Sequence, residues 1–394
     1  MTVWPLENQI RPYAWGSRSF IQDLVGLEPG EPAAEWWMGA HPQAPSRLPD
    51  GRTLAEVEPA LPYLMKVLAA AAPLSLQAHP SREQAALGYA REEAAGIALG
   101  APERHYRDRN HKPELMVGLE DFSALVGFRE PAATWAYVEA LDWPALSAVF
   151  EPLGGGGPDA LRDVFTAVMA GAVQPEDIEH VAGRAAVLAA PDHAVDASAG
   201  HLPHALEARW TAALARAYPG DPGVAAALML NVLVLPPLEG LFLPAGVLHA
   251  YLRGAGIEIM ASSDNVLRGG LTPKDVDIAE LLSVLDFEPQ RPHRVAAHDL
   301  GGGLHAYPVP VVDFALHRAD LDGLGGAALE VPVSGPCIVL AVAGALDVGG
   351  LALTRGGSAY APDGLPPLTG RGRAFIASGT ASGTAGSAGI AIGG

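Results

Sequence analysis

Apolar positions follow two different patterns along this chain. Up to about residue 128 the apolar runs are short and are separated by Pro, Gly and other small residues, and the runs 63–68 and 75–79 predict β-strands. Between residues 131 and 230 apolar side chains recur every three or four positions, which predicts amphipathic helices. The Gly-rich run 154–157 interrupts that pattern. It predicts a turn, because neither a preceding strand nor a following Lys-Ser/Thr pair makes it a phosphate-binding loop.

Strand-like runs return after residue 231. They occur at 232–235 and 240–244, and again at 337–342 and 351–354. Short strands at close spacing with Gly turns are typical of β-sandwiches and jelly rolls. The predicted order is therefore a β unit, a helical unit, more β structure and a second β unit. The Gly-, Ala-, Ser- and Thr-rich end from Gly379 is predicted to fray.

The composition supports a folded protein and limits the classes of partner that it can bind. The 394 residues are 49% apolar and 18% charged, which allows two or three domains and argues against wholesale disorder. Lys and Arg total 25 against 44 Asp and Glu, and the net charge of −19 disfavours a nucleic-acid partner. The single cysteine, Cys337, excludes a disulfide within the chain and a thiolate metal cage. Neither a signal peptide nor a membrane-spanning apolar run is readable, so we expect a cytoplasmic protein without membrane contact.

Lysine is scarce in this sequence. The three lysines are Lys66, Lys112 and Lys274, and the other 22 of the 25 basic residues are arginines. Because arginine serves here wherever a generic positive charge is enough, a retained lysine suggests a need for its compact ammonium or its adjustable pKa. Chance is the alternative for any one of them.

Two pairs of polar residues have the spacing of neighbours on one strand face. Gln77 and His79 lie two apart, so an amide oxygen and an imidazole could meet one divalent cation. The alternative is a hydrogen-bonded pair. Lys112 and Glu114 are also two apart, in the polar run 106–114, and the carboxylate could complete a metal site. An exposed charged loop is the alternative for this segment.

Two later segments add candidate chemistry. His249 follows a Pro-x-Gly turn, an arrangement common in cupin barrels, although a lone His on an apolar strand is also typical of a core residue. Glu258 lies in an apolar strand, and a polar turn after it carries Arg268 and Lys274. These residues offer an acid/base carboxylate and two cations for a phosphate. The alternative is a hairpin with surface charge.

In combination and in order, these segments resemble the type I phosphomannose isomerases, also called mannose-6-phosphate isomerases. The resemblance covers roughly the first 275 residues. The Asn-His-Lys-Pro-Glu run 110–114 and the run 263–274 are its most specific blocks. All three lysines lie in or beside the similar stretches. Those stretches are residues 8–16, 35–42, 74–80, 108–114, 243–251 and 258–274.

The resemblance implies a mainly β fold with an α-helical insertion. It implies a cupin-type jelly roll formed by residues 1–128 with 229–300, a helical insertion at 129–228, and a second jelly roll at 301–394. This agrees with the order of elements predicted above. In the second jelly roll no His stands where a cupin ligand would, so we expect that unit to bind no metal.

The resemblance also implies a zinc site and a reaction. The family binds one zinc through Gln, His, Glu and His, which correspond here to Gln77, His79, Glu114 and His249. His111 is not a ligand in the family and is expected to have a structural role or to support the metal site. The implied reaction interconverts mannose 6-phosphate and fructose 6-phosphate, with a proton moving between C2 and C1 through a cis-enediol.

Roles for further residues come from the same resemblance. The expected catalytic residues are Arg268 for the enediolate or the phosphate and Glu258 as the first choice of proton carrier, with Lys112 and His41 as its competitors or as the groups that open the ring. The expected substrate-binding residues are Lys274, Lys66 and Ser75, which could hold the phosphate, and Tyr251. The expected partner is a small-molecule sugar phosphate, bound by a monomeric chain. Two alternatives stay open: a non-catalytic cupin that binds a sugar phosphate, and an isomerase of another aldose phosphate.

Overall fold

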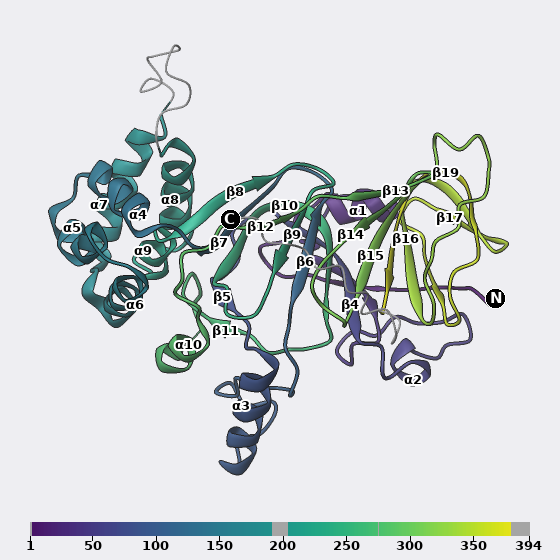
Figure 1. Ribbon diagram of the computed structural model, residues 1–394, viewed down its shortest axis with the longest axis horizontal. Helices are drawn as coiled ribbons and strands as arrows, with labels where there is room; N and C mark the ends of the chain where they lie inside the picture. The colour runs from purple at the N-terminus through teal and green to yellow at the C-terminus, as the bar shows by residue number, and fades with distance from the viewer. Residues whose placement is uncertain (1, 191–203, 275, 380–394) are drawn as a thin grey trace.

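The computed structural model describes residues 2–190, 204–274 and 276–379, and it consists of two antiparallel sheets and a helical region (Figure 1). The helical region lies at one end, the larger sheet in the middle and the smaller sheet at the other end. The predicted mainly β fold with a helical insertion is therefore confirmed. The predicted fraying after Gly379 concerns residues outside the described ranges. Within those ranges, no helix combines the length and the apolar composition needed to cross a membrane.

The larger sheet is assembled from segments on both sides of the helical region. Its strands are β2 (Gln9–Arg11), β3 (Glu35–Gly39), β4 (Tyr63–Ala70), β5 (Gln77–Ala78), β6 (Glu114–Gly118), β7 (Phe122–Phe128), β8 (Leu230–Leu235), β9 (Gly240–Leu243), β10 (His249–Ala261), β11 (Leu267–Arg268) and β12 (His293–Val295). The main path runs β12-β9-β6-β10-β4-β3-β2, while β5 and β7 pair with the first half of β10. The predicted strand at 75–79 is shorter than expected, because only Gln77 and Ala78 have ladder partners, in β10 and β11.

The central strand β10 separates two environments. Glu258 lies opposite Lys66 of β4, whereas Ile257 lies opposite Val67. Because successive side chains of a strand point to opposite faces, Glu258 and Lys66 face a polar pocket, and Ile257 and Val67 pack in an apolar core. Both faces of the strand are therefore covered, and Arg253 is its one exposed residue.

The smaller sheet covers the apolar face of the larger one. Its strands are β1 (Trp4–Pro5), β13 (His298–Gly301), β14 (Leu304–Tyr307), β15 (Ala315–Asp320), β16 (Cys337–Val348), β17 (Leu351–Thr354), β18 (Ser358–Ala361) and β19 (Leu368–Ser378). Their order is β1-β18-β16-β19-β15-β14-β13, with β17 on β16. Phe314, Ile338 and Phe375 from this side join Leu115 and Ile257 of the larger sheet in one buried cluster, which we call the intersheet core. The first strand, β1, thus belongs to the sheet formed by the end of the chain.

The helical region lies between β7 and β8. Its helices are α4 (Pro131–Leu141), α5 (Pro144–Phe150), a 3₁₀ turn (Glu151–Gly154), α6 (Pro158–Ala167), a π turn (Val168–Ala172), α7 (Pro175–Leu188), α8 (Ala205–Ala217) and α9 (Gly223–Ala227). Proline at the first turn of α4, α5 and α7 favours these starts, because its fixed φ suits that position and its missing N–H is not needed there. The predicted break at 154–157 lies between the 3₁₀ turn and α6.

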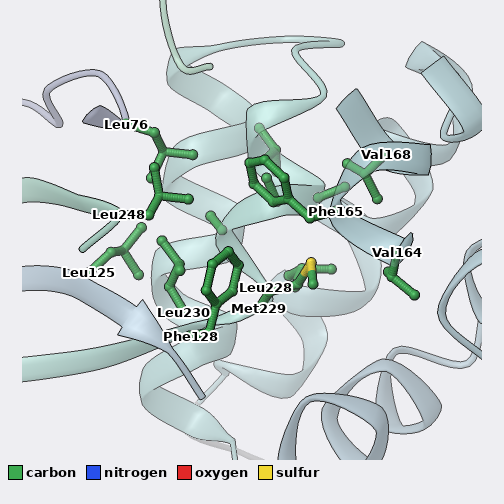
Figure 2. Close-up of a cluster of buried hydrophobic side chains, with 14 of the residues drawn as sticks. Leu76, Leu125, Phe128, Val164, Phe165, Val168, Leu228, Met229, Leu230 and Leu248 are labelled. Atoms are coloured by element: carbon green, nitrogen blue, oxygen red, sulfur yellow. The ribbon is translucent and has the colours of Figure 1, made fainter. Parts of the chain in front are cut away.

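The core of the helical region extends onto the larger sheet. In Figure 2, Phe128 and Phe165 lie among apolar side chains from both parts, and Leu76 and Leu248 belong to the same cluster. Both leucines are fully buried. Leu76 directly precedes Gln77 and Leu248 directly precedes His249, so this core anchors the backbone that carries two candidate metal ligands.

Four further helices lie beside the larger sheet. They are α1 (Phe20–Val25), α2 (Leu54–Val57), α3 (Arg82–Ala94) and α10 (Ile278–Val284). Two of them, α1 and α2, pack into the intersheet core. Helix α3 projects away from the sheet (Figure 1) and begins at a capping box in which Ser81 accepts from the backbone N–H of Gln84. The chain returns from α3 through residues 95–113 to β6.

Candidate functional site

A pocket of about 850 Å³ opens over the polar face of the larger sheet. Gln77 and Glu114 line it, whereas His79 and His249 are each 1% exposed and lie against Glu114. The structure thus brings the predicted residues together from segments far apart in sequence. The predicted catalytic and substrate-binding residues that line this pocket are Arg268, Glu258, Lys112, His41, Lys274, Lys66, Ser75 and Tyr251. Lining residues that the sequence analysis did not assign include Glu35, Trp37, Arg107 and Asp264.

Three of the candidate metal ligands converge closely. His79, Glu114 and His249 each offer one ligand atom, and these atoms lie within 4.8 Å of one another. Nε2 of His79 is 3.2 Å from Oε1 of Glu114, and Nε2 of His249 is 3.5 Å from Oε2. The side-chain nitrogen of Gln77 lies 3.3 Å from Nε2 of His249. Turning that amide over would present its oxygen to the same centre.

Backbone carbonyls orient both imidazoles as metal ligands. Nδ1 of His79 donates to the carbonyl oxygen of Asn265 at 2.8 Å, and Nδ1 of His249 donates to that of Val247 at 2.9 Å. Each ring therefore carries its proton on Nδ1 and turns the lone pair of Nε2 toward Glu114. Nε2 of His79 is buried and has no hydrogen-bonding partner in the described part of the chain. A buried lone pair facing a carboxylate needs a cation between them, so this donor set fits a divalent metal such as zinc.

Burial and neighbouring charges set the protonation states that a metal requires. Burial lowers the pKa of His79 to about 4, and the positive charge of Lys112 acts in the same direction. Burial by itself would raise the pKa of Glu114, but the Lys112 ammonium, 2.9 Å from Oε1, holds it well below its usual range. At neutral pH the imidazole of His79 is neutral and the carboxylate ionised, which is the state that binds metal.

The hydroxyl of Tyr251 also belongs to this cluster. It lies 3.4 Å from Oε2 of Glu114, and its ring meets Phe122 edge-on at 5.0 Å. Burial and the charges of Glu258 and Glu114 raise the pKa of Tyr251 well above its usual value, so the hydroxyl stays protonated. The side chain, 1% exposed, therefore acts on the carboxylate as well as lining the pocket.

The polar run 106–114 is buried at Tyr106 and at 112–114 but exposed at Arg107 and Arg109, so its interpretation as an exposed charged loop is wrong for the part that carries Lys112 and Glu114. Lys112 is 8% exposed. The side chain of Asn265 holds the run in place, because it accepts from the backbone N–H of Arg107 at 2.8 Å and donates to the carbonyl of Asn110 at 2.9 Å. The two most specific sequence blocks are thus hydrogen-bonded to each other.

A second group of buried charges lies across strands β3, β4 and β10. Nζ of Lys66 is 3.2 Å from Glu258 and 3.6 Å from Glu35. The indole N–H of Trp37 donates to Glu35 at 2.7 Å, and the Lys66 ammonium lies 5.0 Å from the Trp37 ring centroid. Burial raises the pKa of Glu258, against the opposing charge of Lys66. The sequence analysis gave Lys66 to the phosphate, but its ammonium is enclosed by carboxylates with which a phosphate would have to compete.

The pair His41 and Asp264 lies at another wall of the pocket. Nε2 of His41 is 3.1 Å from the Asp264 carboxylate, and Nδ1 accepts from the backbone N–H of Gln43 at 3.3 Å. Nε2 therefore carries the proton and donates it to Asp264. Burial would raise the pKa of Asp264, but the hydrogen bond from His41 and the nearby positive charges together lower it. Asp264 went unassigned although it lies inside the specific run 263–274.

Three cations share one side of the pocket. Arg268 lies on β11 and not in a turn as predicted, because Leu267 and Arg268 pair with β5, where Arg268 stands opposite Gln77. Its guanidinium donates to the Ser75 hydroxyl at 3.1 Å. Repulsion by Arg268, then burial, lowers the pKa of Lys274, and burial followed by repulsion from Arg107 lowers that of Arg268.

The arrangement of these cations suits an anion. Among the described residues, none of Arg107, Arg268 and Lys274 forms an ion pair with a carboxylate. Their mutual repulsion is relieved when a dianion such as a phosphate binds between them. The interpretation of this segment as a hairpin with surface charge is therefore wrong. Arg107 was not predicted as a site residue, and the only feature of the sequence that pointed to it was its place in the polar run 106–114.

Comparison with known proteins shows similarity along most of the chain. Residues 3–131 match the family described as phosphomannose isomerase type I, catalytic domain. The chain is 36% identical to mannose-6-phosphate isomerase of Escherichia coli (strain K12), over 80% of this chain and 83% of that protein. It is 31% identical to mannose-6-phosphate isomerase of Homo sapiens, over 82% of each. A crystal structure of mannose 6-phosphate isomerase from Salmonella typhimurium with fructose 6-phosphate and zinc has a TM-score of 0.81 at 33% identity, covering 96% of this chain and 100% of that one.

Proposed function

The chain belongs to the type I phosphomannose isomerase family, and from that premise we propose how its residues share the work of the reaction. The enzyme is a zinc-dependent isomerase that interconverts mannose 6-phosphate and fructose 6-phosphate. One observation carries the assignment of roles. A single pocket combines the metal-donor cluster around Glu114, the buried carboxylate of Glu258 and the cations beside Arg268.

Gln77, His79, Glu114 and His249 hold the zinc in this proposal. The orientation of both imidazoles by backbone carbonyls and the unpartnered Nε2 of His79 support it. Zinc supplies Lewis-acid polarisation of a substrate oxygen when bound. Lys112 and Tyr251 keep Glu114 ionised and in place through contacts of 2.9 and 3.4 Å.

Glu258 carries the proton in this proposal. Its carboxylate takes the proton from C2 of open-chain mannose 6-phosphate and delivers it to C1, while the hydroxyl proton moves from O2 to O1. A C–H beside an aldehyde is a weak acid, so the base must be strong enough to compete for its proton. Burial, which raises the pKa of Glu258, strengthens it as a base, and Lys66 fixes its position at 3.2 Å.

Ring opening is assigned to Lys112 and His41. Opening requires a proton to leave the O1 hydroxyl and another to reach the ring oxygen. For the first role Nδ1 of His41 must exchange its 3.3 Å contact with the Gln43 N–H for the O1 hydroxyl, and the Asp264 carboxylate, 3.1 Å from Nε2, then stabilises the charged imidazole. The Lys112 ammonium supports the second role as a proton donor that lines the pocket.

Phosphate binding is assigned to Lys274, Arg107 and Ser75. The first two supply charge at the pocket side where no described carboxylate neutralises them, and Ser75 supplies a hydroxyl. Arg268 lies nearer the metal ligands, opposite Gln77 in the β5–β11 ladder. That position supports a role at the developing enediolate, where a fixed positive charge stabilises negative oxygen.

The unit boundaries and the oligomeric state are also proposals. We assign residues 1–128 with 229–300 to the catalytic unit, 129–228 to the helical insertion and 301–394 to the second jelly roll. The pairing of β1 with β18 means that the first strand is shared with the last unit. We propose a monomer, because every pocket residue named above comes from one chain, and size-exclusion chromatography with light scattering tests it. A cytoplasmic location stays a prediction from the sequence.

A coupled assay tests the proposed function. Mannose 6-phosphate is supplied to the purified protein before chelation, after chelation and after zinc is restored, and fructose 6-phosphate formation is followed. We expect turnover to vanish with the metal and to return with it. A zinc-loaded protein that binds the sugar phosphate without turning it over would instead favour the non-catalytic alternative.

A further inference from the structure

A polar cluster joins the catalytic unit to the smaller sheet beside the metal site. Nε2 of His111 lies 2.9 Å from Oδ2 of Asp313, and the guanidinium of Arg82 lies 2.9 Å from Oδ1. Asp313 stands between β14 and β15 of the smaller sheet, and its side chain is 8% exposed. The catalytic unit therefore reaches across to a buried carboxylate that belongs to the other unit.

Protons cannot satisfy every contact in this cluster at once. Nε2 of His111 is also 2.7 Å from the Arg82 guanidinium, which can only donate, so a nitrogen that donates to Asp313 cannot accept from Arg82. Burial would raise the pKa of Asp313, but the hydrogen bond from His111 and the charge of Arg82 lower it, so the carboxylate is ionised. His111 then donates from Nε2 to Asp313, and Arg82 donates to the other oxygen.

The cluster lies directly before two groups of the active site. His111 is followed by Lys112, whose ammonium lies 2.9 Å from the proposed zinc ligand Glu114. On the other side of Glu114, Leu115 is fully buried in the intersheet core together with Phe314, the neighbour of Asp313. The short stretch from 111 to 115 is thus held at both ends by the smaller sheet, by a polar contact at one end and an apolar contact at the other.

From this geometry we propose that Asp313 is a positioning residue for catalysis: through His111 it sets where the Lys112 ammonium stands in the pocket. The proposal rests on the function proposed above, in which Lys112 acts on the substrate. It gives the smaller sheet a part in the reaction beyond packing. Asp313 itself touches no substrate, since its carboxylate is engaged by His111 and Arg82.

Loss of this contact should affect the chemical step more than substrate binding. A reacting group displaced by about 1 Å can cost on the order of 100-fold in rate. The cations assigned to the phosphate, Arg107 and Lys274, have no contact with Asp313 in the described structure. We therefore expect Asp313→Ala to lower kcat about 10- to 100-fold, with KM for mannose 6-phosphate within about twofold of wild type.

The experiment compares purified, zinc-loaded full-length variants in the coupled assay, with zinc content and thermal midpoint measured for each. Asp23→Ala is the matched control, because it also removes a carboxylate that bridges the two units, 2.6 Å from Arg355, at an exposed site remote from the pocket. It should leave kcat unchanged. Asp313→Asn keeps an oxygen that accepts from His111, and it should recover most of the activity lost in Asp313→Ala.

A second variant breaks the contact from its other side. His111→Ala should lower kcat to the same extent as Asp313→Ala, and the double variant should lose no more than either alone, because one contact is being removed. His111→Ala alone carries the test if Asp313→Ala does not fold. The proposal is overturned if Asp313→Ala and His111→Ala keep a kcat within twofold of wild type. It is also overturned if Asp313→Asn loses as much activity as Asp313→Ala, or if the loss of activity follows the loss of zinc. Failure of the wild-type protein to isomerise mannose 6-phosphate would instead overturn the proposed function.

Discussion

Replacing Lys66 by Met separates two interpretations of that lysine. Its ammonium stands 3.2 Å from Glu258 and 3.6 Å from Glu35, and the lysine side chain is 7% exposed. Methionine has a similar length and no charge, so the substitution keeps the shape and removes the cation. Two carboxylates would then face each other across β3, β4 and β10 with no cation between them.

The size of the effect follows from the distances. At an effective dielectric constant of 20, charges 3.2 and 3.6 Å apart attract by about 5 kcal/mol for each pair before the cost of removing water is subtracted. Measured losses on breaking one side of a buried pair are about 3–5 kcal/mol. At roughly 2.1 cal/mol/K of unfolding entropy per residue, the 394 residues unfolding together shift by about 1.2 °C per kcal/mol, so the thermal midpoint should fall by about 4–6 °C. Part of this loss should disappear at low pH, where one carboxylate is protonated.

Differential scanning calorimetry of zinc-loaded protein measures the shift. Lys274→Met is the control, because Lys274 is exposed at the pocket and has no ion pair in the described residues, so its loss should leave the midpoint nearly unchanged and raise KM. The reasoning is refuted if Lys66→Met melts with the wild type and raises KM as Lys274→Met does. That result would instead support a role for Lys66 in binding the phosphate.

Three other changes test separate parts of the site. Glu258→Gln should keep the zinc, measured by atomic absorption, and should lower kcat about 100- to 10,000-fold, which is the usual contribution of a general base to the rate. Wild-type turnover in this variant would show that Glu258 is not the base. Arg107→Met should raise KM for mannose 6-phosphate about 10- to 100-fold, because a charged hydrogen bond contributes about 1.5–3 kcal/mol; Arg109→Met, whose guanidinium stacks on Tyr89, is the control and an equal effect there would contradict the assignment. Burial raises the pKa of the Cys337 thiol to about 12, so at pH 8 a thiol reagent should label it only after unfolding, and fast labelling of native protein would show that the smaller sheet opens readily.

The sequence predicted those parts of the site that depend on local spacing. Lys112 lies two residues before Glu114, where β6 begins, and their charged groups meet at 2.9 Å. His79 directly follows β5 and reaches the same centre as Gln77, and His249 follows the turn that its Pro-x-Gly signal predicted. The helical insertion was likewise predictable, because its apolar period differs from that of the strands on either side.

Relations between distant strands were not predictable in this way. The buried group of Glu35, Lys66 and Glu258 depends on the register of β3, β4 and β10, and no local pattern specifies which residues stand opposite each other across almost 200 positions. The pairing of β1 with β18 in the smaller sheet was unpredictable for the same reason, because it joins the two ends of the chain. Asp313 went unassigned because nothing near it in the sequence indicates that it lies beside His111.

The two faces of β10 have a consequence for folding errors. A slip of one residue in its pairing would turn Ile257 into the pocket and would force Glu258 into the intersheet core. A misaligned strand would therefore lose the catalytic carboxylate and the docking of the smaller sheet in the same event. The register of β10 therefore determines both the packing of the core and the composition of the pocket, so a chain with the wrong alignment cannot persist as a well-packed but inactive enzyme.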